Sequence, residues 1–201
     1  MTRTLGKLIK SNAHTDYVCQ IYGPREIESP PAPADYAFGT FVRVPLGVER
    51  GDLVGVIYDT VLHNPDFGNL GPRLSPAPDL QIFSPDYLAE KVTLVGITAV
   101  GALAPDGAAT HGVPACSAQI DALVTPLDEA ALRAFHATPA GGVRLGYAPL
   151  LLSLDTPVAR HLLLHIIERL GDLFPAQTKP LAVLREELRW QTIITPLGGA
   201  R

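Results

Sequence analysis

A chain of 201 residues is long enough for one domain, or for one domain and a small second one, and its 47% of hydrophobic residues excludes a disordered protein. The formal net charge of −4 argues against a protein whose main task is to grip nucleic acid, although it leaves room for a local basic patch. Two cysteines are too few for a thiolate metal cluster or a disulfide framework.

The first half of the chain is dominated by segments rich in Val, Ile, Tyr, Phe and Thr, separated by Gly, Pro, Asn and Asp, and this pattern predicts strands. The predicted strands are 5–12, 16–22, 38–46, 53–62 and 92–103. We expect 104–112 to be a flexible link and 114–124 to be either a last strand or an apolar crossover. Two proline-rich segments, Gly23–Pro33 and Asn64–Pro78, are predicted to be loops, and a short helix is expected over Asp86–Glu90.

From Thr125 onward the pattern becomes mainly helical. Thr125 and Pro126 are expected to begin a helix, as N-cap and first-turn residue. A strand interrupted by Pro149 is expected over 143–154, followed by helices over about 156–174 and 178–190, the first with an apolar stripe. The fold class expected is therefore β-rich α+β: a small closed β-barrel over 1–124, and a helical or mixed extension over 125–201 that completes or flanks it.

Three motifs of the first half resemble the HAS-barrel, the N-terminal barrel of HerA-type DNA-translocating ATPases and of rotary ATP synthase subunits. These motifs are Gly6–Ile9 (GKLI), Gly39–Val44 (GTFVRV) and Leu53–Ile57 (LVGVI). Further on, Arg160 and His161 stand where HerA-type ATPases carry an Arg-His pair just before their phosphate-binding loop. No G-x-x-x-x-G-K-[ST] motif occurs in this sequence. The resemblance thus implies a barrel without the ATPase motor.

Two histidines have a spacing that suits a metal. His161 and His165 are four residues apart and would share one face of a helix, with Glu168 or Asp172 as a third ligand. The residue after the first histidine is a leucine, whereas the zincin motif requires a glutamate there, so we favour a structural or interface role and expect no metal and no cofactor. Cys19 is expected to be a buried, unreactive thiol.

Four arginines would supply phosphate contacts if they gathered on one edge of the barrel. They are Arg43, Arg50, Arg73 and Arg144. Aromatic residues make up only 6% of the chain, too few to suggest a platform for base stacking. Contact with nucleic acid is therefore expected to be indirect.

These observations favour a non-enzymatic assembly or adaptor protein. The resemblance implies docking to a HerA-type ATPase or a NurA-type nuclease, or self-association. The expected contact surfaces are the loops 23–34 and 64–78 and the helices over 156–190, with four apolar anchors: Phe67, Leu70, Leu74 and Trp190. Two alternatives stay open, a nucleic-acid-binding barrel and an enzyme whose fold is not recognised.

The sequence also favours a cytoplasmic location. Met1–Lys10 is polar and basic, unlike a signal peptide. The run over 92–103 is too short to cross a membrane, and it contains glycines. We therefore expect no membrane partner.

Overall fold

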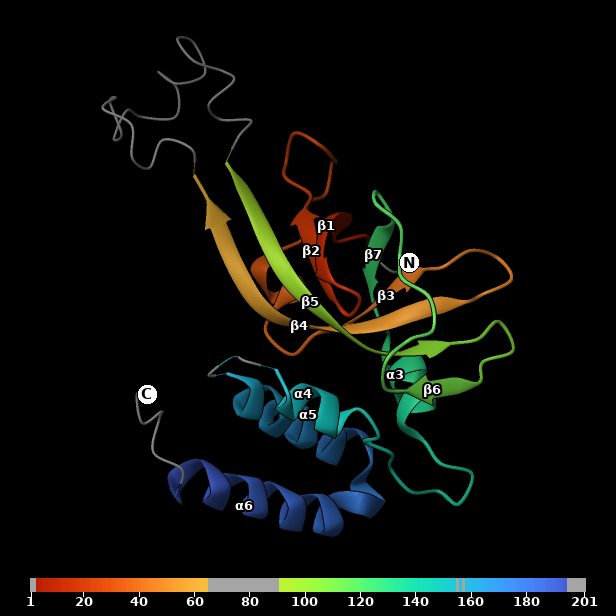
Figure 1. Cartoon of the computed structure of the whole chain (residues 1–201), viewed down its shortest axis with the longest axis vertical. Coiled ribbons are helices and arrows are strands. Elements are labelled where there is room, and N and C mark those ends of the chain that lie inside the picture. The colour runs from red at the N-terminus through yellow and green to blue at the C-terminus, as the bar shows by residue number, and fades with distance from the viewer. Residues whose placement is uncertain (1–2, 65–90, 155, 157, 195–201) are drawn as a thin grey trace.

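The computed structural model describes residues 3–64, 91–154, 156 and 158–194, and it contains a closed β-barrel with helices packed on one side (Figure 1). The strands are β1 (Gly6–Ala13), β2 (Asp16–Ile21), β3 (Phe41–Pro45), β4 (Asp52–His63), β5 (Val92–Leu103), β6 (Ala109–His111) and β7 (Leu123–Pro126). The expected fold class, a small closed β-barrel with C-terminal helices, is confirmed, and each of the five predicted strands is present.

The barrel closes because one sheet returns to its first strand. The order of strands is β2-β1-β7-β3-β4-β5-β6, and β2 also pairs with β5. The closing pairs run from Asp16 opposite Thr98 to Gln20 opposite Leu94. β6 pairs with Gly101–Leu103 of β5 and lies outside the closed wall. All of these pairings are antiparallel.

Alternate side chains of the barrel strands point inward and fill the barrel. On β3, Val42 and Val44 belong to the interior core, whereas Phe41 belongs to a second core outside the wall. The interior residues are Leu5, Leu8, Tyr17, Cys19, Ile21, Val42, Val44, Leu53, Ile57, Val95, Ile97, Ala99 and Val124. Each is at most 5% exposed, so the interior is a packed core, as expected for a barrel of this small size.

The second core lies between the outer wall of the barrel and the helices. The helical elements are η1 (Pro33–Tyr36), α3 (Glu129–His136), α4 (Ala148–Leu152), α5 (Ala159–Leu173), η2 (Pro175–Gln177) and α6 (Thr178–Ile194). Outward-facing Phe41, Val54 and Val56 pack with residues of α3, α4 and α5. The predicted stripe of α5 is buried in this core: Leu162, Ile166, Leu170 and Leu173. α6 packs on α5 and forms the outermost layer (Figure 1).

The predicted strand over 143–154 is wrong. Val143 forms only an isolated bridge with Ala137, and the chain then enters helix α4. Pro149 lies in the first turn of α4, where a missing N–H costs nothing because no intrahelical acceptor exists there. Tyr147 and Leu151, four residues apart, are both fully buried. A continuous apolar run does not distinguish a buried strand from a buried helix, and here tertiary packing selected the helix.

The predicted helix start at Thr125 is also wrong. Thr125 and Pro126 are part of β7, opposite Arg43 and Val42 of β3. The N-cap is Asp128, whose Oδ1 accepts a hydrogen bond of 2.8 Å from the backbone N–H of Ala131. The observed N-cap, Asp128, thus lies three positions after the predicted one, Thr125, because Thr125 and Pro126 pair with β3 as part of the barrel wall.

The expected flexible link over 104–112 contains a strand instead. Gly107 adopts a positive φ of 85°, and its N–H bonds to the carbonyl of Ala104 at 2.9 Å. This turn folds β6 back onto β5. The segment expected over 114–124 as a last strand or a crossover contains both: 114–122 is irregular, and Leu123 and Val124 begin the last strand, β7.

Some predictions stay untested. The helix over Asp86–Glu90 and most of the loop over Asn64–Pro78 lie outside the described residues. The division into 1–124 and 125–201 also stays a prediction, although β7 extends to Pro126. Within the described ranges, none of the helices is both long and apolar enough to cross a membrane.

Candidate functional site

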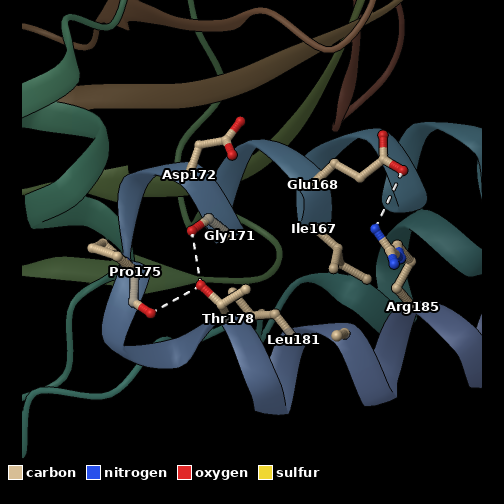
Figure 2. A pocket seen from close by; sticks show the side chains of 9 residues that line it. Ile167, Glu168, Gly171, Asp172, Pro175, Thr178, Leu181 and Arg185 are labelled. Carbon is tan, nitrogen blue, oxygen red and sulfur yellow. Dashed lines mark hydrogen bonds and ion pairs between the residues drawn. The ribbon is translucent and has the colours of Figure 1, made fainter.

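A concave surface with both apolar and charged side chains lies between α5 and α6. It is a groove of about 570 Å³. Figure 2 shows its lining side chains, which come from both helices and from the turn that joins them. Its apolar part is formed by Ile167, Leu181 and Ala182.

Gly171 gives the groove part of its depth. A Cβ at this position would meet no atom within 4 Å, so the missing side chain leaves open space above the helix. The hydroxyl of Thr178 donates toward the carbonyls of Pro175 at 2.9 Å and of Gly171 at 3.4 Å (Figure 2). These contacts tie the start of α6 to the end of α5 and hold that end of the groove in shape.

Charged side chains line the other end of the groove. Glu168 of α5 lies 3.9 Å from Arg185 and 4.0 Å from Arg189 of α6, and Glu186 lies 3.5 Å from each of these arginines. The Nε of Arg185 is buried and has no hydrogen-bond partner among the described residues. Half-exposed ion pairs at such distances contribute little stability. A bound partner could therefore exchange them at small cost.

Two apolar side chains project from the outer side of α6. Val183 is 70% exposed and Trp190 is 62% exposed. They are seven residues apart, about two helical turns, so they lie on the same side of the helix. Trp190, predicted as an anchor, thus lies on the surface, outside the groove lining. The other predicted anchors, Phe67, Leu70 and Leu74, lie outside the described residues.

The proline-rich loop over 23–34 lines a second hollow, of about 520 Å³. Pro24, Pro30 and Pro31 face the end of β2 and the start of β5 across it, together with Tyr36. The start of the loop is held in a turn by a hydrogen bond of 2.7 Å from the N–H of Gly23 to the carboxylate of Glu26. This hollow is lined by one of the two loops predicted as contact surfaces.

The two candidate metal ligands lie on the surface of α5. His161 and His165 are both exposed, and the ring of His165 lies beside Phe38, with 6.2 Å between ring centroids. His165 also packs over Gly39, where a Cβ would come within 2.3 Å of the imidazole. The described residues contain no group of three or more His, Cys, Asp or Glu side chains placed to hold a metal.

The predicted arginine patch is divided among different contacts. Arg43 lies 3.9 Å from Asp52, Arg50 donates to Sγ of Cys116 at 2.9 Å, and Arg144 donates to the carbonyl of Ala109 at 3.0 Å. Arg73 lies outside the described residues. Each described member of the set is therefore engaged by the chain itself, which leaves fewer of their donors for a phosphate.

Two neighbouring histidines, His136 fully buried and His111 partly buried, were not expected from the sequence. The carbonyl of Leu132 can only accept, so Nδ1 of His136 carries the proton, and Nε2 accepts from the hydroxyl of Tyr147 at 2.7 Å. His111 donates from Nε2 to the carbonyl of Phe135 at 2.9 Å, and its Nδ1 accepts from the N–H of Gly146 at 3.2 Å. Every ring nitrogen has a partner.

Burial controls the protonation of these groups. It lowers the pKa of His136 to about 3, with a smaller lowering from nearby His111 and arginines, and it raises the pKa of Tyr147 well above its ordinary value. Burial likewise raises the pKa of the Cys19 thiol to about 12, so this cysteine is the unreactive thiol that was expected. His136 and Tyr147 are fully buried and hydrogen bonded to each other, which suits a structural role that fixes α3 against α4.

One family model matches nearly the whole chain, over residues 2–196, and its description is "Domain of unknown function (DUF8166)". No curated protein matches this sequence.

Proposed function

The chain belongs to the DUF8166 family, and we propose that it is a non-catalytic β-barrel protein that serves as an assembly or adaptor module. The partner we propose is a component of a cytoplasmic DNA-processing system of the HerA ATPase and NurA nuclease type. The HAS-barrel resemblance of Gly6–Ile9, Gly39–Val44 and Leu53–Ile57 supports this partner class.

The observation that carries the docking role is the groove between α5 and α6. It lies in the outermost layer, on the side of α5 that faces away from the barrel (Figure 1). It offers an apolar floor beside Gly171 and a charged end with Arg185. Protein interfaces commonly combine a buried apolar centre with a polar rim, and Trp and Arg are enriched among their strongest contacts. We infer that the partner inserts an apolar side chain over Gly171 and offers a carboxylate to Arg185.

The packed interior of the barrel supports a docking role over a carrier role. A barrel that holds a small ligand needs a lumen, and here aliphatic side chains occupy the interior. Burial lowers the pKa of His111 and of His136. The ring nitrogens of both histidines are engaged in hydrogen bonds within the fold. These arrangements favour a binding surface on the outside of the molecule.

The test is affinity capture with the tagged full chain from native lysate, at moderate salt and with nuclease added, followed by mass spectrometry. We expect stoichiometric recovery of a ring ATPase or nuclease. Gly171→Trp should fill the groove and abolish recovery, whereas Val48→Trp, at a fully exposed turn far along the chain, should not. Recovery that is unchanged by Gly171→Trp would rule out the groove, and recovery of no partner by the unaltered chain would refute the adaptor role.

A further inference from the structure

Strand β4 continues well past the end of its neighbour β3. The pairs between the two strands run from Asp52 opposite Pro45 to Val56 opposite Phe41. The last bonds on that side join the N–H and carbonyl of Ile57 to Thr40 and Gly39. Beyond Ile57, β4 pairs with β5 alone among the described residues. β5 itself pairs with β2 as far as Leu94, so only Leu62–His63 of β4 and Val92–Thr93 of β5 extend past the barrel wall as a two-stranded ribbon (Figure 1).

The open edge of β4 beyond Ile57 presents the main-chain groups of two residues. The pairs of β4 with β5 skip one residue, Tyr58, between Ile57 and Asp59. This extra residue reverses which side each following N–H faces. The N–H of Thr60 accordingly bonds to Oδ1 of Asp59 at 2.8 Å. Alternation then places the N–H and carbonyl of Thr60 and Leu62 on the open edge, and those of Val61 on the β5 side.

The side chains along this edge are exposed and partly apolar. Val61 is 49% exposed and Leu62 is 79% exposed. Natural proteins normally protect such edges by covering or charging them. The short outer strand β6 illustrates this protection, because Arg144 covers the carbonyl of Ala109. On β4 the corresponding cover, as far as the described residues go, is the carboxylate of Asp59 on the N–H of Thr60.

We propose that this edge pairs with the same edge of a second copy of the chain, antiparallel and centred on Val61. A twofold axis at Val61 places Thr60 opposite Leu62 of the other copy, and these are the two residues whose main-chain groups face outward. The same axis places Asp59 opposite His63, so the imidazole of each copy can donate a hydrogen bond to the carboxylate of the other, and the edge is complementary to itself in side-chain as well as main-chain hydrogen bonding. The carboxylate of Asp59 leaves the N–H of Thr60 and turns to the imidazole of the partner copy. This pairing does not depend on the groove between α5 and α6.

The first test is sedimentation velocity of the full chain over a concentration series. We expect a reversible monomer–dimer equilibrium for the unaltered chain. Leu62→Pro removes a donor that faces the open edge and leaves the bonds to β5 intact, so we expect a folded monomer. Leu62→Thr is the matched control: it keeps the N–H and suits a strand, and it should still dimerise. Circular dichroism of each variant confirms that the barrel is folded.

Charge reversal tests the register. Asp59→Arg should weaken the dimer at least tenfold, because it places an arginine opposite His63. The double variant Asp59→Arg with His63→Asp should restore the affinity. A chain that stays monomeric at the highest concentration, a folded Leu62→Pro variant that still dimerises, or a double variant no better than the single one would each overturn the proposal.

Discussion

The two halves of strand β4 have the same secondary structure and opposite surroundings. Leu53–Ile57 lies between β3 and β5 and is fully buried, whereas Asp59–His63 is exposed throughout. Both halves are rich in β-branched and aliphatic residues, so intrinsic strand propensity does not separate them. The difference comes from neighbours: the first half has the barrel core on one face and the helices on the other, whereas in the described ranges the second half pairs with β5 alone. The comparison teaches that burial, and not strand formation, distinguishes the half of β4 that stabilises the fold, Leu53–Ile57, from the exposed half, Asp59–His63.

The largest effect should follow a loss of volume in the buried half. Ile57→Ala removes a fully buried side chain of the barrel interior, where the closed wall allows little collapse. We expect the free energy of unfolding to fall by about 2–5 kcal/mol. Urea unfolding followed by circular dichroism measures it. A loss below about 1 kcal/mol would mean that the interior repacks freely, contrary to a tightly filled barrel.

The next effect tests the layer that covers the buried half. Tyr147→Phe keeps the ring but removes the hydroxyl that donates to Nε2 of His136. A buried acceptor without its donor should cost about 1–3 kcal/mol of unfolding free energy. The measurement is again urea unfolding, with Tyr22→Phe as a control at a tyrosine outside both cores. Equal stabilities of the two variants would contradict the structural role of the pair.

The same pair predicts a pH dependence. The pKa of His136 is lowered in the folded state to about 3, so between about pH 6.5 and 3 the unfolded chain binds a proton that the folded chain does not. Stability is therefore complete above about pH 6.5 and falls as the pH decreases, by up to about 1.4 kcal/mol per pH unit from this group. His136→Gln should have a shallower slope than the unaltered chain in denaturation at a series of pH values. Identical slopes would show that His136 is not buried in its neutral form.

A smaller gain is expected in the outer helical layer. Gly171→Ala adds a Cβ that meets no atom within 4 Å and removes a flexible residue from the last turn of α5. We expect a stabilisation of about 0.5–1 kcal/mol. Thermal unfolding measures it. A destabilised variant would mean that the space over Gly171 is needed by the fold itself and is no docking groove.

The smallest effect belongs to the free half of β4. Val61→Ala changes a half-exposed side chain on the part of β4 that, among the residues the structure describes, pairs with β5 alone. We expect a change within about 0.5 kcal/mol when unfolding is measured at low concentration, where the monomer prevails. The contrast with Ile57→Ala is the sharpest test of the comparison. A loss as large as that of Ile57→Ala would show that this part of β4 belongs to the core.

Local sequence patterns predicted much of this fold, because strands, turns and helix faces each select residue types over a few neighbouring positions. β-branched residues between turn-forming residues predicted β1 to β5, since a pleated strand selects the former and a chain reversal the latter. The stripe of Leu162, Ile166 and Leu170 predicted the buried face of α5. The prediction failed at 143–154, where an apolar run without a period leaves helix and strand equally plausible until its neighbours are known.

The candidate site was less predictable than the fold. The sequence predicted Trp190 as an exposed anchor, and its side chain is exposed, although its role at an interface stays a prediction. The groove between α5 and α6 left no pattern in the sequence, because a missing side chain at Gly171 becomes a hollow only when α6 packs beside it. No local pattern distinguishes His111 and His136 from ordinary surface histidines. Their contacts with Phe135 and Tyr147 form only when β6, α3 and α4 meet in the folded chain.

The sequence by itself determined that this chain forms a β-rich barrel with helices after it, because alternation, turn residues and helical periodicity act over a few neighbouring residues. Only the tertiary structure decided that Thr125 and Pro126 complete the barrel wall, that His136 is neutral and buried, and that β4 beyond Ile57 pairs with β5 alone within the described part of the chain. The physical reason is the same in each case. Burial, protonation and strand pairing depend on which distant segments meet, and that information is absent from any short window of the chain.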